Sequence, residues 1–293
     1  MTKSFYAALF FVCLYTSCFS QTTGNGASDD IDFAFYLFEE RKYDETILFF
    51  EQNILNFKQN TSAFDSISYI LGMTHYYRKE LEKSAFHLSN VSKSSAFYDK
   101  SIFFSALDYA HLGEYSKAQT ILENYSTATP NSNYDELLAV NLAGIGLLKR
   151  DFDMFDRHAK NFRFEQYYYA NSQSQLINAR KELYDFRKKS PFAAGTFSAI
   201  VPGAGKIYTG QIGEGVAAFL TVGVLAAITA ENWTKNGIAD WKTITFGSVF
   251  TIFYIGNIVG SAATVKIYRN QFNDRQNNTI LLDIHLPVRA LFE

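Results

Sequence analysis

The run Gly-Ala-Gly-Lys at residues 203–206 is the part of the sequence that most resembles a chemical motif. A phosphate-binding loop needs a further glycine five residues before the second of these glycines, and a serine or threonine after the lysine. Ile200 and Ile207 stand at those positions. A dinucleotide-binding turn needs a third glycine where Tyr208 stands. Both patterns fail, so we expect no nucleotide and no other cofactor.

The remaining reactive residue types show no spacing that favours catalysis. None of the histidines has a metal-binding spacing such as His-Glu-x-x-His, and we interpret them as packing or surface residues. They are His75, His87, His111, His158 and His285. The two cysteines, Cys13 and Cys18, both lie in the first 20 residues. We therefore predict no catalytic residue, no metal site and no enzymatic activity.

Composition favours long packed helices. Of 293 residues, 47% are hydrophobic and 17% aromatic, while only 4 are proline. These proportions are not typical of a disordered chain or a turn-rich β sandwich. The formal net charge of -2 gives no reason to expect nucleic acid as a partner.

The N-terminus has the pattern of a signal peptide. Lys3 precedes an apolar stretch, and small residues lead up to a cleavage site after Ser20. Residues 21–29 then form a polar linker. Alternatives are a buried N-terminal helix and a lipoprotein cut before Cys18. Cleavage after Ser20 would leave a mature chain without cysteine, which excludes disulfides and a cysteine nucleophile.

Four segments between residues 30 and 162 follow one template. The third segment places Ala106 and Ala118 where two helices would cross, with a turn at 113–115. An aromatic residue or leucine marks the turn in each segment, at positions 43, 81, 115 and 152. The template resembles the tetratricopeptide repeat, a helix–turn–helix of about 34 residues. The alternative is an irregular helical bundle; either interpretation makes residues 30–189 all-α, including a further helix at 171–189.

The resemblance implies an α-solenoid whose groove binds a protein or peptide segment. Exposed tyrosines are the candidate contacts, and packing between helices is an equally good interpretation of them. The candidates are Tyr76, Tyr77, Tyr167, Tyr168 and Tyr169.

Composition changes again in residues 190–269. Residues 212–230 carry one charge, Glu214, and residues 243–265 carry none. A membrane-spanning helix needs about 20 apolar residues, so the second stretch is long enough and the first is marginal. The pair predicts a helical hairpin through a lipid bilayer, with a soluble apolar helix pair as the alternative.

A Pro-Gly-x-Gly-Lys-x-Tyr-x-Gly motif precedes this hairpin. Its residues are Pro202, Gly203, Gly205, Lys206, Tyr208 and Gly210. The motif resembles that of the TM2-like membrane modules, some of which follow tetratricopeptide repeats in Gram-negative envelope proteins. A structural turn at the membrane interface is the plainer interpretation. The alternative is a lipid or small-ligand site, for which Glu214, Tyr254 and Asn257 are the nearby polar residues.

Two features remain open in the sequence. The tail, residues 270–293, contains an apolar run at 279–286 that is compatible with a short strand or an extended end. Basic residues flank the hairpin and favour cytoplasmic repeats, whereas the leader favours export. We follow the leader and predict an envelope interaction protein, anchored in the inner membrane, with its repeats in the periplasm.

Overall fold

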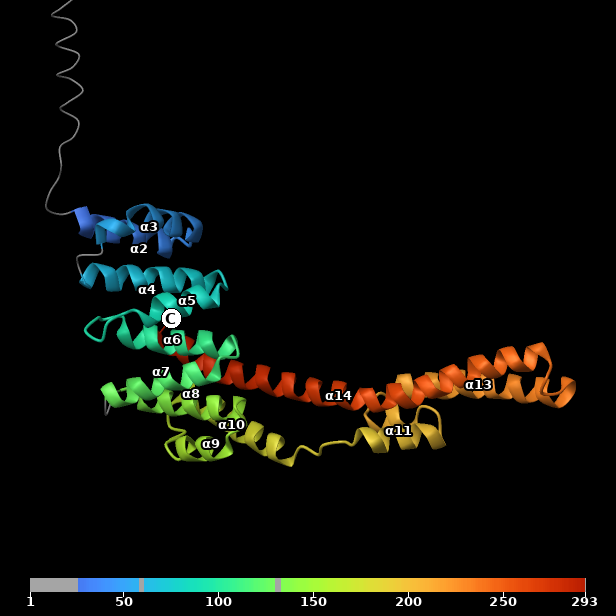
Figure 1. The fold of residues 1–293 in the computed structure, drawn as a ribbon. Helices are drawn as coiled ribbons and strands as arrows, with labels where there is room; N and C mark the ends of the chain where they lie inside the picture. Colours follow the sequence, from blue (N-terminus) through green and yellow to red (C-terminus); the bar gives the residue numbers. More distant parts are fainter. Residues whose placement is uncertain (1–25, 58–60, 130–132, 293) are drawn as a thin grey trace, which may run out of the picture. The chain divides into compact units, whose positions relative to one another are not determined.

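The computed structural model of this protein describes residues 26–57, 61–129 and 133–292 (Figure 1). Within these residues the chain forms thirteen helices, which confirms the predicted all-α class. The predicted signal peptide lies outside the described residues. The chain divides into two compact units. The first holds residues up to 149, 153–169 and the C-terminal residues from Ile284, and the second holds 150–152 and 170–283.

Eight helices follow one another in the first unit and form four pairs. In chain order they are α2 (Gly26–Glu39), α3 (Tyr43–Phe57), α4 (Thr61–Tyr77), α5 (Leu81–Ser89), α6 (Tyr98–His111), α7 (Tyr115–Ala128), α8 (Asp135–Leu148) and α9 (Phe152–Ala159). The second helix of each pair begins at 43, 81, 115 or 152, the four positions that the sequence template marks as turns.

The same turn joins the two helices of every pair. Two residues before the second helix, the backbone is left-handed, with φ of 58° at Arg41, 62° at Lys79, 80° at Gly113 and 60° at Arg150. A left-handed residue ends a helix by redirecting the chain and satisfying its last carbonyl groups. In the first three turns the following N–H bonds the carbonyl five residues earlier, at 2.8–2.9 Å. All four turns thus share the left-handed residue, and the first three also share this hydrogen bond.

Small residues let the paired helices approach each other. Ala106 and Ala118 are almost fully buried, as the template predicts. At Gly72 an added Cβ would lie 2.5 Å from the Leu88 side chain, so α4 and α5 pack with no room for a larger residue. Phe50, Phe103, Phe104 and other large side chains fill the core between the helices. Burial of such side chains is the main stabilising contribution in a stack of this kind.

The second unit contains most of α10 (Tyr167–Asp185) and the helices α11 (Pro191–Ile200), α12 (Ala204–Tyr208) and α13 (Ile212–Asn236). The long helix α14 (Trp241–Phe292) begins in this unit, and its last residues, from Ile284, belong to the first. The run 279–286 is therefore helical, and the strand that the sequence left open there is wrong.

Helices α13 and α14 are long and apolar enough to cross a membrane. Their apolar side chains are largely exposed: Leu220 is 57%, Ile252 69% and Val259 64% accessible. A core helix of a soluble protein would bury such residues, because each exposed one forgoes about 1.5–3 kcal/mol. The exposure favours the membrane hairpin over the soluble apolar pair.

Candidate functional site

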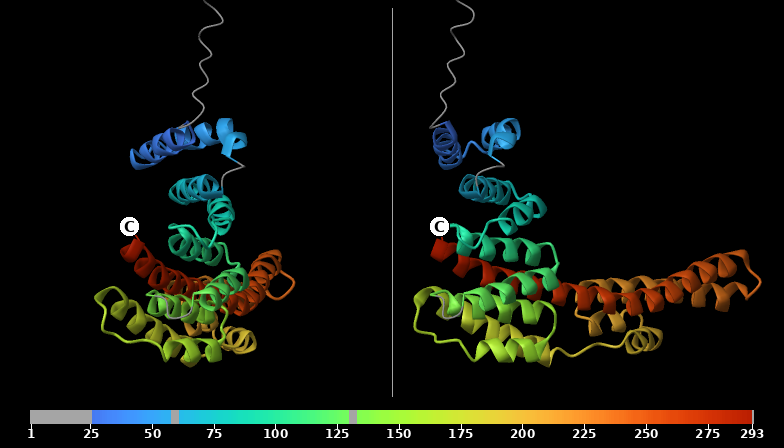
Figure 2. Two further views of the ribbon diagram at one scale, coloured as in Figure 1. Left: turned by 90° about the vertical axis from the view of Figure 1, so that its left-hand side faces the viewer. Right: turned by 60° about the vertical axis from the view of Figure 1, so that its left-hand side comes forward.

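The C-terminal end of α14, from Ile284, belongs to the first unit and packs against its other helices. Figure 2 shows this end beside the middle of the helix stack. Ile284 and Val288, one turn apart on one face of the helix, are both fully buried. The surface that receives the C-terminal end, which we call the docking face, is made by residues of α4, α6 and the start of α8. They are Tyr76, Phe103, His111 and Tyr134.

Ring contacts and a hydrogen bond between Tyr76 and His285 hold this helix end in place. The hydroxyl of Tyr76 lies 2.5 Å from Nε2 of His285, although the two residues are 209 positions apart in the chain. The His285 ring also meets His111 edge to face, with centroids 5.3 Å apart. Phe292 contacts Phe103, at 5.8 Å between ring centroids. The docking face therefore already holds an α-helix through aromatic side chains.

An open pocket of about 620 Å³ lies within the same unit, next to the docked helix end. We call it the aromatic pocket, and its lining residues are Phe38, Glu39, Arg41, Tyr43, Tyr77 and Arg289. The rings of Tyr43 and Tyr77 are stacked, with centroids 5.6 Å apart. With two arginines and one glutamate around three aromatic rings, the pocket suits an apolar or aromatic side chain next to an acidic group.

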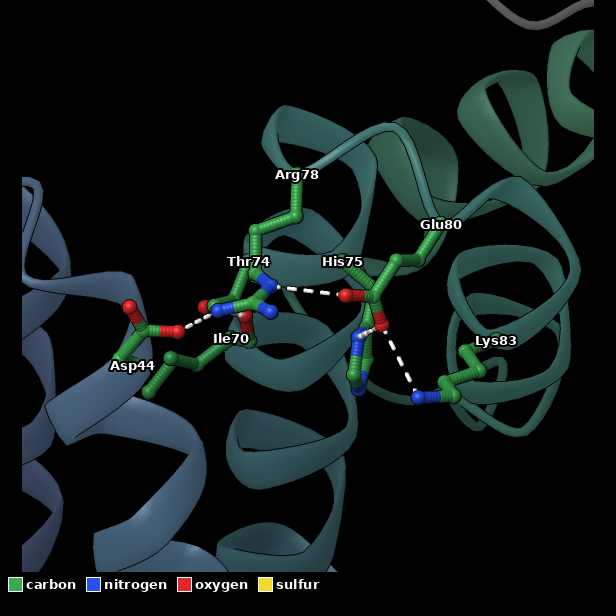
Figure 3. Close-up of polar contacts among 7 residues, drawn as sticks. All are labelled: Asp44, Ile70, Thr74, His75, Arg78, Glu80 and Lys83. Carbon is green, nitrogen blue, oxygen red and sulfur yellow. Dashed lines mark hydrogen bonds and ion pairs between the residues drawn. The ribbon is translucent and has the colours of Figure 1, made fainter.

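A polar cluster fixes the turn between α4 and α5 (Figure 3). Nδ1 of His75, Nε of Arg78 and Nζ of Lys83 lie 2.8–3.0 Å from the Glu80 carboxylate. The hydrogen bonds from Lys83 and Arg78 lower the pKa of Glu80 to about 2. Arg78 also pairs with Asp44 on α3. Because these charged groups pair with one another, we interpret the cluster as a joint between two helix pairs.

The five predicted contact tyrosines are not in one place. Tyr76 lies on the docking face and Tyr77 in the aromatic pocket. Tyr167 and Tyr168 are 91% and 55% exposed at the start of α10, whereas Tyr169 is buried. The structure thus brings two of the five together beside the docked helix.

The predicted glycine motif forms a tight turn between α11 and α13. Gly203 has a φ of 84°, and an added Cβ would clash with the carbonyl of Gly215 in α13. A Cβ at Gly205 would clash with the carbonyl of Ala194 in α11. Both glycines therefore let the backbones of neighbouring helices touch. Gly210, with a φ of 92°, has open space around it.

Side chains from α11 and α14 hold the backbone of this turn. The N–H of Gly203 donates to Oδ1 of Asn257 at 3.1 Å, and the N–H of Gly205 donates to Oγ of Ser198 at 2.9 Å. Ser198 in turn donates to Ser261 at 2.7 Å. The hydroxyl of Tyr254 donates to the carbonyl of α11 residue 199 at 2.6 Å. Sequence reasoning named Asn257 and Tyr254 but missed the two serines, because buried serines carry no distinguishing spacing.

Lys206 and Glu214 form the charged pair of the motif. Nζ of Lys206 lies 3.2 Å from Oε2 of Glu214, and the side chains are 22% and 61% exposed. The backbone carbonyl of Tyr208 accepts a hydrogen bond from Nζ of Lys189 at 2.7 Å. Pro202 lies at the start of the turn, after the end of α11. Lys189 also sits over the Tyr268 ring at 4.1 Å, which ties the motif to α14.

Two observations bear on whether these arrangements could carry out chemistry. The Ser198 hydroxyl bonds another hydroxyl rather than a general base. Among the described residues, no three His, Cys, Asp or Glu side chains gather closely enough to hold a metal ion. Comparison with protein-family models, with curated proteins and with solved structures gave no match. Inferences about function therefore rest on the geometry described above.

Proposed function

We propose that this protein is a membrane-anchored interaction protein of the bacterial envelope. Its first unit would be a tetratricopeptide-like solenoid that binds a helical segment of a partner protein, and α13 with the start of α14 would anchor it in the bilayer. A role in the assembly of envelope or membrane proteins follows from the resemblance of its motif to envelope modules.

The observation that carries this proposal is the C-terminal end of α14 on the docking face. The first helices of the pairs contact that helix through Tyr76, Phe103 and His111. Recognition of an amphipathic helix in a groove uses buried side chains one turn apart as anchors, and Ile284 and Val288 have that spacing. A surface that accepts one helix in this way suits a second helical segment placed beside it.

The aromatic pocket supplies the place for the partner. It is open next to the docked helix and is lined by rings and arginines, the residue types enriched at the centres of protein interfaces. We propose that an apolar or aromatic anchor of the partner packs against the stacked rings of Tyr43 and Tyr77, with an acidic neighbour facing Arg41.

Site-specific photo-crosslinking in living cells tests this proposal. A photoreactive phenylalanine analogue at Tyr77 should give one discrete crosslinked species with a partner protein. The matched control is the same analogue at Phe86, which is 61% exposed on α5 and does not line the pocket. Failure to crosslink at Tyr77, or the same product from both positions, would contradict the proposal.

A further inference from the structure

A groove of about 430 Å³ lies between α13 and α14, within the second unit. Lys206 and Glu214 line one end of it, and its walls further along are apolar, with Val222 on α13 and Phe253 on α14. From Glu214 to Val222 an α-helix advances about 12 Å. We call this space the hairpin groove; it is polar at one end and apolar along its length.

Small residues leave the room that the groove needs. Ala217, Ala218 and Gly256 line it, and a Cβ added at Gly256 would meet no atom within 4 Å. Asn257 also borders the groove, but its amide already bonds the Gly203 N–H and the Ser198 carbonyl. The Lys206–Glu214 pair is therefore the polar feature at this end that can receive a ligand. An acyl chain along the apolar walls, with its headgroup at the pair, matches both parts.

We propose that the hairpin groove binds a zwitterionic phospholipid whose headgroup carries a primary amine, such as phosphatidylethanolamine. The lipid phosphate pairs with the Lys206 ammonium, and the lipid ammonium donates to the Glu214 carboxylate. The two protein charges, 3.2 Å apart, match the opposite charges of such a headgroup. The 61% exposure of the Glu214 side chain leaves its carboxylate accessible to the amine.

Other headgroups fit less well. An anionic headgroup satisfies Lys206 and brings a negative charge beside Glu214, where like charges repel. The trimethylammonium of phosphatidylcholine has no N–H to donate to the carboxylate. The selectivity expected from one partly exposed ion pair is about threefold.

This inference rests on the proposed membrane location of the hairpin, and two measurements keep the two claims apart. Resistance of the chain to extraction from membranes by alkaline carbonate tests the location. Lipid binding is then measured on the purified full chain in detergent by native mass spectrometry. The probes are phosphatidylethanolamine, its monomethyl and dimethyl derivatives, phosphatidylcholine and phosphatidylglycerol, all with identical acyl chains.

For the unaltered chain we expect affinity to fall about threefold along the methylation series, and phosphatidylglycerol to bind more weakly than phosphatidylethanolamine. Glu214→Gln should abolish the preference for the primary amine, and Lys206→Gln should weaken binding of all five lipids. The matched control is Lys235→Gln, which breaks the Lys235–Glu231 pair near the other end of α13, outside the groove.

Equal binding of the methylated series by the unaltered chain would overturn the inference, whatever the variants do. An equal loss of selectivity in Lys235→Gln would overturn it as well, since the effect would then be one of net charge. A chain that carbonate extracts from the membrane would instead contradict the proposed anchoring.

Discussion

Asp108 carries a carboxyl group buried in the last turn of α6, with no exposed surface. Burial raises its pKa to about 7; the nearby Ser84 hydroxyl opposes the shift, although no hydrogen bond of normal geometry reaches either carboxylate oxygen. The folded state thus holds a proton that the unfolded state has lost above about pH 4. The contribution of Asp108 is therefore most favourable at low pH and is lost as the pH rises towards 7.

Asp108→Asn should remove this pH dependence. Relative to the unaltered chain, the variant should gain stability between pH 4 and pH 7, by about 4 kcal/mol at most, because a neutral amide has no charge to desolvate. Thermal unfolding of both chains, followed by circular dichroism across this range, measures the difference. A difference in stability that stays constant with pH would contradict the role given to Asp108.

His87 has the opposite effect on the pH dependence of stability. Burial lowers the pKa of His87 to about 4, so this residue destabilises the folded state as the pH falls below 6.5.

Alanine substitutions at Gly203 and Gly210 distinguish the energetic cost of backbone strain from the cost of close packing. Both have positive φ, but only Gly203 lies against another helix backbone. Gly210→Ala should cost about 1–2 kcal/mol for the left-handed conformation. Gly203→Ala should cost about 2 kcal/mol more, because the methyl group must push α12 away from α13. The comparison is thermal unfolding in detergent micelles; equal costs would show that α12 and α13 can separate freely.

Among the helices, the local sequence pattern predicted the helix pairs but did not predict the docked C-terminal end of α14. The turns were predictable because each depends on a few adjacent residues, and the marked position in every segment begins the second helix. Ile280, Ile284 and Val288 also recur every four residues, a helical spacing. Three leucines at positions 281, 282 and 286 interrupt this spacing, and Pro287 is not typical of a helix interior. The helical pattern was therefore not recognised in the sequence. The contact of His285 with Tyr76 joins distant parts of the chain, and a local sequence pattern does not predict such a contact.

Ile284→Ala should destabilise the first unit by about 2–4 kcal/mol, because it leaves a cavity under a fully buried side chain. Leu286, two residues away, is 47% exposed, so Leu286→Ala should change stability by less than about 1 kcal/mol. Limited proteolysis and thermal unfolding of the two variants provide the comparison. Equal effects would mean that the end of α14 does not dock through its Ile284 face.

For the whole molecule, the proposed hairpin determines which parts of the chain share a side of the membrane. A hairpin of two spanning helices leaves the residues before α13 and after the span in α14 on one side and residues 237–240 on the other. The leader predicts export of the first unit, whereas the basic flanks predict the reverse orientation. The leader and the basic flanks are both statistical indicators of orientation, and here they point in opposite directions.

Single cysteines resolve this orientation. Ser116 is exposed on α7, and Asp240 lies in the short connection between α13 and α14. With the leader removed, Ser116→Cys should react with a membrane-impermeant maleimide in cells with a permeabilised outer membrane, and Asp240→Cys only after lysis. The reverse pattern would place the first unit in the cytoplasm. Reaction of both before lysis would show that the hairpin does not span.

The dependence of the docking face on residues 284–292 also sets an order of events during synthesis. A ribosome adds about 5–20 residues per second, and N-terminal parts fold first. More than a hundred residues separate the end of α9 from Ile284, so roughly ten seconds pass before the last helix turns exist. Throughout that time each nascent chain presents Tyr76 and its neighbours uncovered. The face closes only after α13 and the apolar part of α14 have been made, so its closure reports that synthesis has passed both apolar helices.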